Sequence, residues 1–90
     1  MTIEEADFRL TPINDSSPFF DLELLDTIKP KGKEARQEFK NAAYGIKLET
    51  ALRMIAHRRI CNKHPDAISI QIYLNEFKEE VKSLKALCEN

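Results

Sequence analysis

Glycine is scarce in this chain of 90 residues, with only Gly32 and Gly45 present. A phosphate-binding loop needs several glycines at fixed spacing, so we do not expect a nucleotide site of that kind. The two cysteines, Cys61 and Cys88, are too few and too far apart for a disulfide framework, and we expect both to be reduced thiols. Apolar runs are a few residues long, whereas a membrane span needs roughly 20.

The start of the chain also lacks the features of a secretory signal. Residues 1–7 are acidic, where a signal peptide is basic and then apolar. We therefore expect a cytoplasmic protein with no membrane attachment. The length suits one domain with a small core. We expect residues 1–7 to be a flexible acidic N-terminus and residues 8–90 to form a single α+β domain.

Alternation of apolar and polar residues predicts strands in the first half of the chain. Residues 19–28 place Phe20, Leu22 and Leu24 on one face, which is typical of a half-buried strand. Residues 8–13 alternate more weakly and suit an edge strand, since they contain a proline. The Lys/Gly-rich stretch after residue 28 predicts a hairpin turn with a solvated tip.

Residues 34–44 fit two structures. Ala35, Phe39 and Ala42 are spaced like a helix face, and the surrounding composition favours helix. Against this, Gly45 costs about 1 kcal/mol inside a helix, and the apolar spacing changes at that point. A strand paired back on residues 19–28 is the competing structure. We favour the strand, and the helix remains the alternative.

The second half of the chain predicts two helices, at about 47–62 and 66–88. Pro65 ends the first helix, because the residue before a proline is disfavoured in helical geometry. The second carries apolar residues at alternating spacings of four and three, the pattern of a helix-packing seam. We expect this seam to pack on the first helix, with a homodimer as the alternative. Its members are Ile70, Leu74, Phe77, Val81 and Leu84. The expected fold is α+β, with two or three antiparallel strands followed by two antiparallel helices.

Charge is segregated along the chain although the net charge is −1. Residues 1–28 carry one arginine against seven acids, net −6, and residues 29–64 carry ten basic residues against three acids, net +7. Mutual neutralisation is the simpler interpretation, and a partner surface is the other. If the basic segment binds a partner or a nucleic-acid backbone, the candidate residues are Lys29, Lys31, Lys33, Arg53, Arg58, Arg59 and Lys63.

A metal site and a catalytic site are both poorly supported. His57, Cys61 and His64 fall on one side of the first helix, and Cys88 is a conceivable fourth ligand. A structural zinc site normally has closely spaced ligands on both sides, however, and Cys88 stands alone. We therefore expect no metal and no cofactor. A catalytic thiol needs a base and an orienting third group, which local spacing does not supply, so we do not expect an enzyme.

Several segments together resemble short accessory proteins of phages and mobile elements. They are residues 20–25 (FDLELL), a Lys/Gly-rich turn, residues 38–45 (EFKNAAYG) and residues 48–52 (LETAL). The resemblance implies a β-hairpin followed by two helices, and it favours the strand for residues 34–44. Proteins of this kind usually have a Ser or Thr cap before the first helix, whereas Ile46 and Lys47 stand here.

Together these features predict a small, non-enzymatic, protein-binding accessory factor. The resemblance implies that its target is a host protein, such as part of a defence complex. The alternative function is binding of DNA or RNA through the basic hairpin tip and the basic helix.

Overall fold

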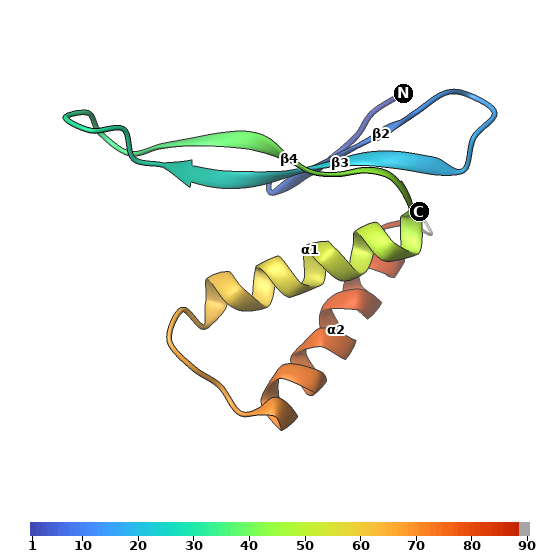
Figure 1. Cartoon of the computed structure of the whole chain (residues 1–90). Coiled ribbons are helices and arrows are strands. Elements are labelled where there is room, and N and C mark those ends of the chain that lie inside the picture. Colours follow the sequence, from blue (N-terminus) through green and yellow to red (C-terminus); the bar gives the residue numbers. More distant parts are fainter. Residues whose placement is uncertain (89–90) are drawn as a thin grey trace. The chain divides into compact units, whose positions relative to one another are not determined.

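Four strands precede two helices in the computed structural model, which describes residues 1–88 apart from the side chain of Cys88 (Figure 1). The elements are β1 Ile3–Glu4, β2 Phe8–Pro12, β3 Phe19–Ile28, β4 Arg36–Lys47, α1 Leu48–Lys63 and α2 Ile70–Cys88. They form two compact units, Met1–Leu48 and the helical residues that follow. The α+β class is confirmed, whereas the sheet has four strands rather than the expected two or three.

The strands form one antiparallel sheet in the order β1-β2-β3-β4. Phe8 lies opposite Leu24, and Leu10 lies opposite Leu22. All four side chains are at most 5% exposed. Because side chains alternate between the faces of a strand, these four define one buried face of the sheet.

The N-terminal residues contain a short strand that we did not predict. In β1, Ile3 pairs with Leu10 and Glu4 pairs with Arg9. The backbone N–H of Glu5 donates to the carbonyl oxygen of Phe8 at 3.0 Å, which closes the turn into β2. Residues 1–7 were expected to be a flexible lead-in and instead include this strand. A two-residue strand is too short to show periodicity in the sequence.

The uncertain stretch at residues 34–44 contributes to a strand, β4, which extends to Lys47. Register shifts opposite Phe20–Leu22 and Leu22–Glu23 show that β4 carries extra residues, as at β-bulges. Gly45 has a φ of 61°, and its N–H donates to Asp21 Oδ1 at 3.0 Å. Glycine is favoured there because a side chain is strained at positive φ. The bulges disturb strict alternation, which explains the mixed pattern in the sequence.

The first helix begins as predicted, at about residue 47, whereas the second begins later. α1 starts directly after β4, at Leu48. α2 starts at Ile70 rather than near residue 66, because Ser69 caps it: Ser69 Oγ accepts a hydrogen bond from the Ile72 N–H at 3.2 Å. The buried positions of α1 form a broad stripe that consists of Ala51, Leu52, Ile55, Ala56 and Ile60.

Candidate interaction surfaces

The predicted apolar seam of α2 is buried at only one end. Leu84 is 1% exposed, whereas Ile70 and Leu74 are 77% and 58% exposed. Phe77 and Val81, between them, are half-buried. The spacing of the seam is therefore as predicted, but the first two seam positions have no covering partner within the described residues.

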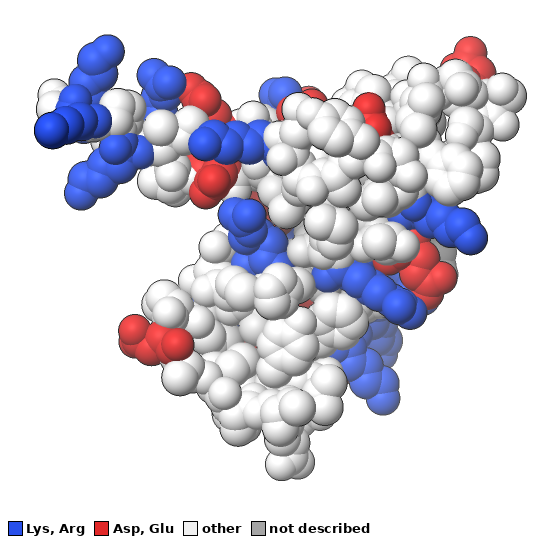
Figure 2. Space-filling model, in the orientation of Figure 1, with Lys and Arg blue, Asp and Glu red and all other residues white. Residues whose placement is uncertain are grey.

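The exposed end of the seam lies in an uncharged stretch of sequence. Residues 67–75 contain no charged side chain, and Ile72, on the opposite side of the helix from Ile70 and Leu74, is 46% exposed. Figure 2 shows this region as an uncharged surface at the bottom of the view. We call the pair of Ile70 and Leu74, which lie one turn apart on the same face of α2, the α2 patch. An exposed apolar surface can mark a site where another protein binds.

Several polar contacts join the two helices. Near the connecting loop, His64 Nε2 lies 2.7 Å from Glu76 Oε2, and at the other end Lys85 Nζ lies 3.8 Å from Glu49 Oε1. This order of contacts shows that the helices run antiparallel, as predicted. Between these ends, Glu80 accepts from Arg59 at 3.5 Å and lies 3.7 Å from Lys63 Nζ.

These ion pairs neutralise part of the helical portion of the predicted basic surface. Arg59 and Lys63 share Glu80, and Arg53 lies 3.6 Å from Glu49 within α1. Arg58 also has an interaction partner. Partners that already balance the charge leave less of it for a phosphate backbone, so α1 is a weak candidate for nucleic-acid binding.

The hairpin-tip lysines have a different environment. Lys29, Lys31 and Lys33 are exposed, and none forms an ion pair with a described residue. The Lys33 N–H donates to the Pro30 carbonyl oxygen at 3.2 Å, and Gly32 at the third position of this turn has a φ of 78°. That geometry is a type II turn, which requires positive φ at its third position. The predicted turn is confirmed, and it presents the three lysines together.

The sheet neutralises part of the acidic N-terminal segment internally. Arg9 pairs with Glu4 and lies 3.5 Å from Glu23, and its guanidinium stacks 4.1 Å from the centre of the Phe39 ring. The hydrogen bond to Glu4 raises the pKa of Arg9 above its usual value. Each unit therefore carries its own charge pairs, and these pairs in the sheet lie within the acidic segment itself.

The candidate metal ligands His57, Cys61 and His64 do not come together at one point: His57 contacts Cys61, whereas His64 lies apart from both. His57 Nε2 lies 3.4 Å from Cys61 Sγ, and His57 Nδ1 lies 2.9 Å from the Tyr73 hydroxyl. His64 instead faces Glu76, and the side chain of Cys88 lies outside the described residues. No cluster of three metal-ligating side chains occurs in the described part of the chain. The sequence did not reveal Tyr73 as the group that orients His57, because the contact spans the two helices.

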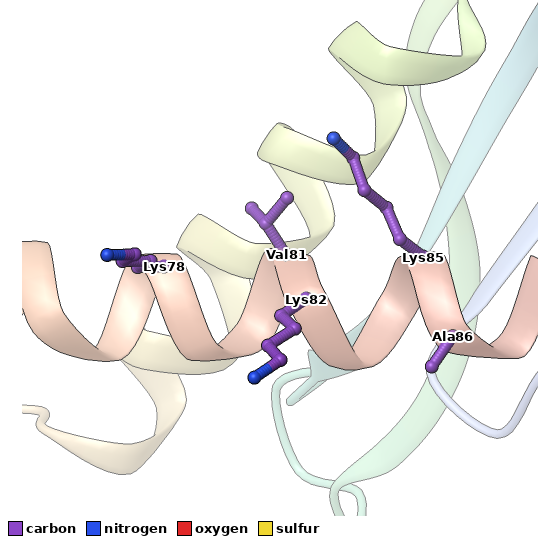
Figure 3. Close-up of a pocket in the computed structure, with 5 residues that line it drawn as sticks. All are labelled: Lys78, Val81, Lys82, Lys85 and Ala86. Atoms are coloured by element: carbon purple, nitrogen blue, oxygen red, sulfur yellow. The ribbon is translucent and has the colours of Figure 1, made fainter.

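A shallow hollow lies along α2 (Figure 3). Its volume is about 530 Å³, and it is lined by Lys78, Val81, Lys82, Lys85 and Ala86. Lys78, Val81 and Lys85 point to one side of the helix, and Lys82 and Ala86 point to the other. The lining contains three lysines and two apolar residues and no carboxylate or histidine.

Comparison with known protein families, curated proteins and solved structures finds no match to this chain. Among residues 1–88, neither helix has the length and apolar character needed to cross a membrane.

Proposed function

We propose that this chain is a small, non-enzymatic, protein-binding accessory factor that docks its partner on the α2 patch. The observation that carries the proposal is the exposure of Ile70 and Leu74 on one face of the helix, in a stretch without charge. Water solvates such a surface poorly, and burial against a partner removes that cost.

The geometry of the patch suits an apolar surface on the partner. Ile70 and Leu74 are four residues apart, so they lie on the same helix face, one turn from each other. Full burial of one such side chain stabilises a complex by about 1.5–3 kcal/mol. These two positions alone therefore account for roughly a hundredfold or more in affinity.

The non-catalytic part of the proposal is supported by the surfaces described above. The hollow on α2 is lined by lysines and apolar residues, without a carboxylate or histidine to act as a base beside them. The contact between Cys61 and His57 lies on an exposed helix surface, where water is not excluded from the thiol. Catalysis by a thiol also needs donors that stabilise the developing negative charge. The resemblance to phage and mobile-element accessory proteins suggests a host protein as the target.

Site-specific photo-crosslinking tests the docking surface. A photoreactive residue at Gln71, beside the patch, is expected to form a covalent adduct with the partner in the native host cell. The same probe at Asp15, in the β2–β3 turn, serves as the control and is expected to form none. The double substitution Ile70→Gln and Leu74→Gln should abolish the adduct at Gln71. An adduct that persists in this variant, or that forms equally at Asp15, would contradict the proposal.

A homodimer through α2 would use the same residues. Light scattering coupled to gel filtration distinguishes this case, because a dimer has twice the chain mass of 10.4 kDa. A dimer that dissociates in the Ile70→Gln, Leu74→Gln variant would identify a second copy as the partner.

A further inference from the structure

The hairpin formed by β3 and β4 extends beyond the rest of the sheet (Figure 1). Pairing between β2 and β3 reaches Leu24. From Asp26 to Ile28, β3 pairs with β4 alone, with Asp26 opposite Glu38 and Ile28 opposite Arg36. We call residues 26–38 the arm. It is a two-stranded ribbon that ends in the lysine-containing turn.

The charge of the arm is concentrated at its tip. Arg36 Nε lies 2.7 Å from Glu38 Oε1, and Asp26 has an interaction partner, so the base of the arm is largely paired. Residues 29–35 hold three lysines against the single acid Glu34, a net charge of +2. Figure 2 shows these cations grouped at the end of the arm, on the left of the view.

The shape and charge of the arm together indicate the kind of partner. The major groove of B-form DNA admits a two-stranded β-ribbon, whereas that of A-form RNA is too narrow. Lysines without ion-pair partners form favourable contacts with phosphate and release counterions from DNA. Single-stranded nucleic acid is bound largely by stacking on aromatic side chains. Phe39, the aromatic residue nearest the arm, is covered by Arg9 and so is not free to stack.

We propose that the arm binds the phosphate backbone of double-stranded DNA through Lys29, Lys31 and Lys33. The contact is independent of base sequence, because lysine–phosphate contacts position a protein without reading bases. This site shares no residue with the α2 patch, so the DNA-binding proposal can be tested independently of the proposed protein-binding function.

Fluorescence anisotropy with a labelled 20-base-pair duplex tests the proposal. Each phosphate contact contributes about −0.9 to the slope of log affinity against log salt, so three contacts give about −2.7. Affinity is therefore expected to fall about 500-fold between 20 and 200 mM NaCl. The triple substitution K29Q/K31Q/K33Q should remove most of the binding and bring the slope near zero. Each single substitution should reduce the slope by about 0.9.

A matched variant controls for total charge. K78Q/K82Q/K85Q removes the same three charges from α2, and its affinity and salt slope should equal those of the unchanged protein. Circular dichroism of both variants verifies that the fold is retained. Equal losses in the two variants, or no binding at 20 mM NaCl, would overturn the proposal. So would stronger binding to anionic lipid vesicles or to poly-glutamate than to the duplex.

Discussion

Leu84 and Ile70 belong to the same sequence pattern, yet the structure predicts that truncating them changes the free energy of unfolding by very different amounts. Leu84 is 1% exposed and Ile70 is 77% exposed. Replacing a buried leucine with alanine removes its transfer free energy and leaves a cavity, at a cost of about 2–5 kcal/mol. The same truncation of an exposed side chain usually changes stability by at most about 0.5 kcal/mol. We therefore expect Leu84→Ala to be strongly destabilising and Ile70→Ala to be nearly neutral.

The assay is urea unfolding followed by helical circular dichroism. At about 0.05–0.15 kcal/mol per residue, a chain of this size has about 5–13 kcal/mol of stability, so Leu84→Ala can unfold much of the population without denaturant. Leu84→Val is the gentler variant, because it removes one methylene and costs about 1 kcal/mol. If the free energy of unfolding falls by about 1 kcal/mol per molar urea, the urea concentration at the midpoint of unfolding should be about 1 M lower for this variant.

Ile70→Ala is the matched control, and its midpoint should stay within about 0.5 M of the unchanged protein. Equal losses of stability for Leu84→Val and Ile70→Ala would refute the reasoning. That result would show that the whole seam is buried in solution, either within the chain or in a dimer. Repeating the measurement at a tenfold lower protein concentration separates these two cases, because only a dimer loses stability on dilution.

Three further predictions follow from local geometry. Gly45→Ala should cost about 1–2 kcal/mol in thermal unfolding because of its positive φ. Gly32→Ala should cost about the same, because its φ is also positive and open space around it adds no steric clash. A neutral result at both would contradict the backbone argument. Glu80→Gln should destabilise by about 1 kcal/mol at low salt, with the difference shrinking in 1 M NaCl. Alkylation of Cys61 by iodoacetamide should slow several-fold in His57→Ala, measured by mass spectrometry; an unchanged rate would show that the imidazole does not activate the thiol.

Local sequence determined much of the secondary structure. The alternation of Phe20, Leu22 and Leu24 located β3, and its predicted range of 19–28 agrees with the structure. Pro65 correctly marked the end of α1. These predictions succeeded because strand alternation and proline geometry act over a few neighbouring residues. β1 and the start of α2 were missed, because a two-residue strand has no period and Ser69 is one of several polar residues that could cap.

Only the tertiary structure decided which surfaces remain available. The sequence determined that Ile70 and Leu84 share a helix face, since the spacing of apolar residues fixes this. Which end of that face is buried depends on where other segments lie. In the same way, the sequence made both α1 and the hairpin tip basic, but folding placed Glu80 beside Arg59 and left Lys31 unpaired by described residues. Composition counts charges, whereas contacts between distant segments determine which charges are neutralised.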